Sequence, residues 1–73
     1  MDKRTMVAVA AILSTLNETG SSPASILYIG LGMDHSFYVK VQVILASAGL
    51  VTVSDSHLVE ITEKGRALAV QID

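Results

Sequence analysis

The first part of the chain carries apolar residues at helical spacing. They recur three or four positions apart, at Met6, Val9, Ile12, Leu13 and Leu16. This spacing puts a stripe of apolar side chains on one side of a helix, so it predicts a helix from Lys3 to Glu18 that packs on a core. Asp2 stands in the N-cap position, and Thr19-Gly20 ends the helix because glycine tolerates the left-handed C′ position.

Two further helices are predicted from local start and stop signals. Ser22 is placed to cap a second helix over residues 23–31, whose first residue is a proline that needs no N–H there. Asp34 is placed to cap a third helix over residues 35–48, which Gly49 closes. The second and third helices are therefore joined by a short turn.

After Gly49 the pattern changes from helical to extended. Residues 50–53 and 58–61 are rich in β-branched and apolar side chains, and polar residues 54–57 separate them. This arrangement predicts a β-hairpin. Thr62 then stands in an N-cap position, which predicts a short last helix running toward the C-terminus.

Composition limits the class of protein. A chain of 73 residues is one domain, and its 51% hydrophobic and 16% charged content excludes disorder. The absence of cysteine excludes disulfides, iron–sulfur clusters and thiolate zinc sites. The formal net charge is −2, so the chain lacks the basic surplus that marks many nucleic-acid-binding proteins.

A signal peptide is the one targeting alternative. The charged residues 1–4 followed by the apolar stretch 6–13 have its general form. Helical periodicity continues through Leu16, however, which is typical of a helix in a folded core. No stretch approaches the roughly 20 apolar residues of a membrane span, so we expect a soluble, cytoplasmic protein.

The order of these elements and several of their residues resemble the winged helix-turn-helix family. Apolar residues stand where that family locks its two helices together, at Leu27, Leu31, Met33, Tyr38 and Val41. The run Leu45–Val51 is similar to the family's L-x-x-x-G-L-V exit from the recognition helix, and Ile61–Arg66 is similar to its L-T-x-K-G segment. The resemblance implies one domain over residues 1–73 of the α+β class, mainly α, with a three-helix core, a two-stranded hairpin wing and a short C-terminal helix.

A narrower resemblance concerns the second helix. Ser22-Pro23, Ile26-Leu27-Tyr28 and Gly30 are similar to small archaeal winged-helix DNA-binding proteins, which dimerise through a long C-terminal helix. This resemblance implies a homodimeric transcriptional regulator or chromatin-associated protein that binds double-stranded DNA. The surplus of apolar residues on the first, third and last helices also predicts a dimer.

In such a protein the helix over 35–48 is the recognition helix and the hairpin over 50–61 is the wing. The residues predicted to face DNA are His35, Ser36, Val39, Lys40 and Val43, with Lys3, Arg4, Lys64 and Arg66 at the flanks. This surface holds few of the Arg, Lys, Asn and Gln side chains that usually contact bases and phosphates. The wing carries Asp55, His57 and Glu60 instead of a basic tip.

A second hypothesis therefore stays open. Phe37, Val39, Val43 and Ile44 are more apolar residues than one helix of so small a domain is expected to bury. Exposed apolar patches usually mark protein interfaces. The domain is then a winged-helix module for protein–protein interaction or dimerisation that does not bind DNA.

Catalytic, cofactor and metal hypotheses have weaker support. Residues 34–36 and 55–57 contain the residue types of a hydrolase triad, but neighbours in a turn point apart and Asp and Ser are ordinary cap and turn residues. Gly30-Leu31-Gly32 is only a fragment of a dinucleotide fingerprint and is better interpreted as the helix-turn-helix turn. His35 and His57 could share a metal, but two surface imidazoles are more often solvated. We expect no enzyme activity, cofactor or metal.

Overall fold

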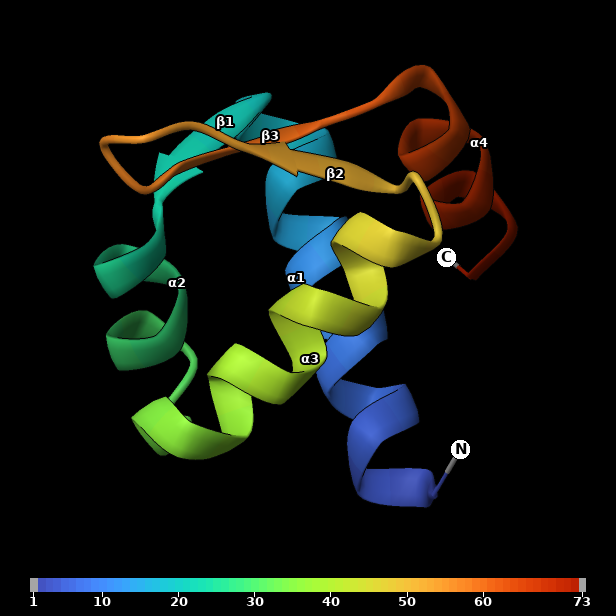
Figure 1. Cartoon of the computed structure of the whole chain (residues 1–73). Helices are drawn as coiled ribbons and strands as arrows, with labels where there is room; N and C mark the ends of the chain where they lie inside the picture. The colour runs from blue at the N-terminus through green and yellow to red at the C-terminus, as the bar shows by residue number, and fades with distance from the viewer. Residues whose placement is uncertain (1, 73) are drawn as a thin grey trace.

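The computed structural model describes residues 2–72 and has an α+β fold that is mainly helical (Figure 1). The part described contains four helices and a three-stranded antiparallel sheet. In chain order the elements are α1 (Lys3–Thr19), β1 (Ser21–Pro23), α2 (Ala24–Gly30), α3 (His35–Ser47), β2 (Val51–Val53), β3 (Leu58–Ile61) and α4 (Glu63–Ile72). This order is compatible with a winged-helix layout.

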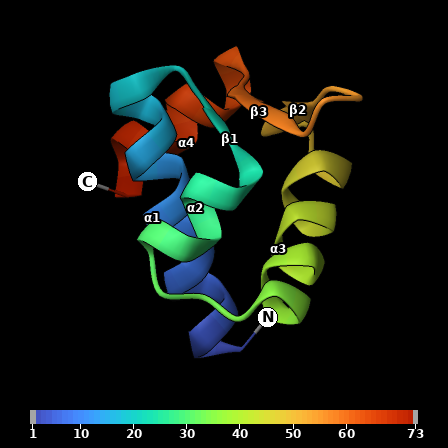
Figure 2. The ribbon, with the colours of Figure 1, turned by 90° about the vertical axis from the view of Figure 1, so that its left-hand side faces the viewer.

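Helix α1 provides the largest share of the core. Its apolar stripe is buried from Ala8 to Leu16, and Ile12, Leu13 and Leu16 are fully enclosed. Helices α3 and α4 pack against it, and the sheet lies across one end of the helices (Figures 1 and 2). The other buried apolar residues come from the remaining helices, from β2 and β3, and from the residue just before β2: Leu27, Tyr38, Val41, Leu45, Leu50, Val51, Val59 and Ala69. The periodicity of the first helix therefore predicted the buried side correctly at Val9, Ile12, Leu13 and Leu16. It was wrong at Met6, which is 57% exposed because the first turns of α1 extend past the elements that cover the rest of the stripe.

The sheet corrects two of the sequence predictions. Strand β3 is central and pairs antiparallel with both β1 and β2, so the sheet has three strands and not the two of a simple hairpin. Ser22 is not an N-cap but a buried residue of β1 that pairs with Val59. Helix α2 begins at Ala24, with Pro23 in the cap position and no side-chain cap hydrogen bond. Proline is tolerated in β1 because this is an edge strand. Only a central strand must hydrogen-bond to a neighbour on both sides, so the missing N–H of proline is acceptable at the edge.

The predicted caps of the first and third helices are confirmed. Thr5 donates its backbone N–H to Asp2 Oδ1 at 2.8 Å, and hydrogen bonds from Thr5 lower the pKa of this carboxyl. Ser36 donates its backbone N–H to Asp34 Oδ2 at 3.2 Å. Helix α3 ends at Ser47, one residue before the predicted end.

Thr62 joins the end of α3 to the start of α4. Its hydroxyl donates to the carbonyl oxygen of Gly49 at 2.6 Å and accepts the backbone N–H of Gly65 at 3.0 Å. Its own N–H donates to the carbonyl of Leu50 at 3.0 Å. The predicted N-cap therefore also ties α4 to the turn between α3 and β2.

At Gly65, helix α4 approaches the backbone of this turn closely. A Cβ at this position meets the carbonyl oxygen of Leu50, and it lies 2.8 Å from Cγ1 of Ile61. Backbone atoms of Leu50 have no rotamer by which to move away, so the contact excludes any side chain unless α4 shifts.

We expect Gly65→Ala to lower the free energy of unfolding by about 1–3 kcal/mol, the usual cost of overpacking a well-packed site. Gly30→Ala is the matched control, because nothing lies within 4 Å of a Cβ there. Alanine favours a helix over glycine, so the control is expected to be neutral or more stable by up to about 1 kcal/mol. Urea unfolding followed by circular dichroism measures both variants, and equal stabilities would contradict the close approach at Gly65.

Candidate functional site

Helix α3 contacts the core along one side only. Tyr38, Val41 and Leu45 are buried against the rest of the domain, and burial raises the pKa of the Tyr38 hydroxyl. The five residues of α3 predicted to face a partner are all exposed: His35, Ser36, Val39, Lys40 and Val43. They form the α3 face, and the helix that carries them crosses the front of the molecule in Figure 1. The predicted exposure of these five residues is confirmed, but the His35 ring lies against Tyr28 of α2 and so does not point away from that helix.

The α3 face is weakly charged and partly apolar. Lys40 is the only charged residue within α3, and residues 51–61 contain no lysine or arginine. Asp34 at the start of the helix and Asp55 in the hairpin turn are exposed acids. Val39 and Val43 are 41% and 58% exposed, so water meets apolar side chains on both sides of Lys40.

Two of the predicted flanking cations lie at the ends of α3. The guanidinium carbon of Arg4 is 3.9 Å from the centroid of the Phe37 ring in the first turn of the helix. Lys64 donates from Nζ to the carbonyl oxygen of Ala48 at 2.9 Å, just after the last turn. Lys3 is exposed beside Arg4 at the start of α1. These contacts place positive charge near both ends of α3.

Arg66 lies elsewhere. Its Nη1 donates to the carbonyl oxygen of Asn17 at 3.1 Å and to Oδ1 of the same residue at 3.3 Å. Asn17 belongs to the last turn of α1, where backbone carbonyls lack helical partners. Figure 2 shows α3 on one side of the molecule and α4 on the other. The structure therefore uses Arg66 to tie α4 to α1 and does not bring it to the α3 face.

The two histidines line a common cleft between the start of α2 and the hairpin turn. The His35 ring stands edge-on to Tyr28, with ring centroids 5.1 Å apart. His57 has a positive φ of 63°, and its carbonyl accepts the backbone N–H of Ala24 at 2.9 Å. Within residues 2–72 no three His, Cys, Asp or Glu side chains come together to hold a metal ion. The sequence named Tyr28 only as part of the second helix; its contact with His35, across the turn between α2 and α3, was not predicted.

Several of the residues whose types match a hydrolase triad have structural roles. Asp34 caps α3, as described above. In the hairpin turn, the Ser54 and Ser56 hydroxyls are 3.0 Å apart, and Ser54 Oγ accepts the backbone N–H of Leu58 at 3.2 Å. The cap and turn interpretation of Asp34 and of the hairpin serines is therefore supported by their hydrogen bonds.

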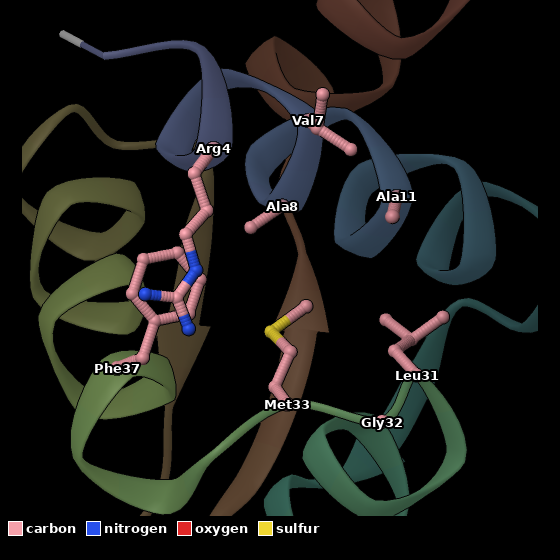
Figure 3. A pocket seen from close by; sticks show the side chains of 8 residues that line it. All are labelled: Arg4, Val7, Ala8, Ala11, Leu31, Gly32, Met33 and Phe37. Atoms are coloured by element: carbon pink, nitrogen blue, oxygen red, sulfur yellow. The ribbon is translucent and has the colours of Figure 1, made fainter.

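Two grooves flank the N-terminal half of α1. The turn groove, about 220 Å³, lies between α1 and the turn joining α2 to α3, and its lining residues are Arg4, Val7, Ala8, Ala11, Leu31, Gly32, Met33 and Phe37 (Figure 3). The α4 groove, about 360 Å³, is lined only by apolar residues: Met6, Val9, Ala10, Ile44, Ala48, Leu50 and Leu68. The sequence pointed to surplus apolar residues on the helices of the α4 groove but gave no signal for the turn groove.

The chain matches no protein-family model and no curated protein. Among the helices of residues 2–72, none combines the length and apolar character needed to cross a membrane.

We expect Arg66→Gln to lower the free energy of unfolding by about 0.5–1 kcal/mol, because the exposed helix end at Asn17 loses a charged donor. Lys3→Gln removes the same charge at the opposite end of α1 and should change stability by less than about 0.5 kcal/mol. Thermal unfolding of the two variants checks this. An Arg66 variant as stable as the Lys3 variant would show that the Asn17 contact contributes nothing.

Proposed function

We propose that this chain is a winged-helix module that binds double-stranded DNA, with α3 as the recognition helix and the β2–β3 hairpin as the wing. The observation that carries the proposal is the exposure of α3. This helix packs on the core with one side and leaves the whole opposite side exposed to water. Its 13 residues make a helix of about 20 Å, which the DNA major groove admits. The resemblance of the exit from α3 and of the segment after the wing supports the same function.

Each part of the α3 face has a role in this proposal. Lys40, in the middle of the helix, contacts a phosphate, and Lys3 and Lys64 add contacts near its two ends. His35 and Ser36, in the first turn, are placed to meet base edges, which recognition helices contact through their N-terminal residues. Val39 and Val43 offer apolar contact to thymine methyl groups.

The small number of cations requires more than one copy on the DNA. Each phosphate contact contributes about −0.9 to the slope of log K against log salt, so one copy with a few contacts binds weakly. A dimer doubles the number of contacts. We therefore propose a homodimeric regulator or chromatin-associated protein that acts in the cytoplasm.

The α4 groove is the proposed dimer interface. Its lining is entirely apolar, and Met6 projects beside the hollow with 57% of its surface exposed. A face that carries both a projecting side chain and a hollow is suited to a two-fold contact with a second copy of itself. A standard interface covers about 800 Å² of each partner, less than a fifth of this domain's 4468 Å². Pairing through this groove leaves the α3 face free for DNA.

A second candidate function is favoured by the apolar character of the α3 face. Val39 and Val43 flank the single cation Lys40, and a surface of this kind is more typical of a protein interface than of a DNA contact. On this hypothesis a second copy of the chain covers the α3 face, and the domain is a dimerisation module that does not bind DNA.

DNA binding is tested by fluorescence anisotropy with a labelled duplex over a range of salt. We expect Lys40→Ala to weaken binding and to reduce the salt slope by about one, as the loss of one phosphate contact does. Arg66→Ala is the control with the same change in charge, and it should keep the slope because Arg66 is bound to Asn17. A wild-type protein that leaves the duplex free at about 50 mM salt would exclude the DNA function.

The two candidate functions predict different dimer interfaces, which sedimentation velocity at micromolar concentration distinguishes. If the α4 groove is the interface, Met6→Asp gives monomers that bind DNA more weakly, and Val43→Asp remains dimeric. If a second copy covers the α3 face, Val43→Asp gives monomers and Met6→Asp remains dimeric. A wild-type protein that is monomeric at every concentration would contradict both.

A further inference from the structure

The turn groove combines an apolar lining with a charged group. Figure 3 shows α1 along one side of it and the turn from α2 to α3 along the other. Arg4 stands at one end beside Phe37, and Ala11 and Leu31 stand at the other. A ligand lying along the groove therefore meets a cation at one end and only apolar side chains at the other.

The cation is held in a position suited to an anion. The guanidinium of Arg4 lies 3.9 Å from the centroid of the Phe37 ring, and this stacking contact restricts the movement of the long side chain. Stacking uses the face of the guanidinium and leaves the N–H donors at its edge. These donors match a carboxylate, which accepts two parallel charge-assisted hydrogen bonds.

The remainder of the groove suits a short aliphatic chain. Ala8 and Ala11 are small and create the hollow on the α1 side, while Leu31 and Met33 border it on the turn side. Val7 is 60% exposed at the rim, so covering it removes apolar surface from water. From Arg4 to Ala11 the helix rises about 10 Å, which sets the length of the chain that fits. The volume of about 220 Å³ is below the roughly 300 Å³ at which sites for drug-sized molecules begin.

We propose that the turn groove binds a small amphiphilic carboxylate, with the carboxylate on Arg4 and an aliphatic chain lying between α1 and the turn toward Ala11 and Leu31. The apolar lining and the single cation together select this class over an alcohol, an amine or a doubly charged anion. The proposal concerns a surface separate from the exposed side of α3, and it does not depend on DNA binding.

The test uses sodium octanoate as the probe and the isolated protein without DNA. Titration followed by ¹H–¹⁵N NMR is expected to show saturable shifts at Ala8, Ala11 and Met33. Octylammonium, which has the same chain and the opposite charge, is expected to leave these signals in place. Equal binding of the two probes would overturn the proposal, because it would show an apolar contact without a carboxylate site.

Variants then separate the charge from the groove. Arg4→Met should weaken octanoate binding at least about tenfold, the factor expected for a lost charge-assisted pair. Lys3→Met removes a neighbouring cation outside the groove and should bind octanoate like the wild type. Arg4→Glu should reverse the preference and bind octylammonium better than octanoate.

Ala11→Leu fills the far end of the groove and leaves Arg4 in place. It should block octanoate while keeping the fold, which circular dichroism checks. Equal effects of Arg4→Met and Lys3→Met, or octanoate binding that survives Ala11→Leu, would overturn the proposed position of the ligand. Failure of octanoate to bind a protein that still binds duplex DNA would overturn this inference alone.

Discussion

Burial of the apolar stripe of α1 is the interaction on which the rest of this structure depends. Ile12, Leu13 and Leu16 are fully enclosed because β1, β3, α3 and α4 all pack on this one helix. Burying a side chain of this size contributes about 1.5–3 kcal/mol, and a domain this small has a net stability of only a few kcal/mol. Any shift of α1 would therefore disturb the four elements that pack on it.

This arrangement determines which surfaces are free. Helix α3 needs only one side for its contact with the core, so its other side is available to a partner. The sheet covers one end of the helices (Figure 1), and the N-terminal half of α1 has a groove on each side. The α3 face and the two grooves are thus consequences of packing a small number of elements around one helix.

The cationic side chains fall into two groups: those that make contacts within the fold and those that are exposed where a partner could bind. Lys64 and Arg66 donate to backbone carbonyls after α3 and in the last turn of α1, where positive charge favours the negative end of the helix dipole. Arg4 is stacked on Phe37. Lys40 is therefore the one cation within the α3 face itself, with Lys3 and Lys64 near the ends of the helix, and the strength of any DNA contact depends on the number of copies that bind together.

The sequence alone determined the features that depend on neighbouring residues: the stripe of α1, the caps at Asp2, Asp34 and Thr62, and the outward side of α3. Helix periodicity and capping act within a few positions, so the local pattern contains them. Only the tertiary structure decided that β1 joins the sheet, since its three residues carry no strand pattern and their partner β3 lies far along the chain. The partner of Arg66 and the two grooves were likewise decided by the packing of distant elements, which no local pattern records.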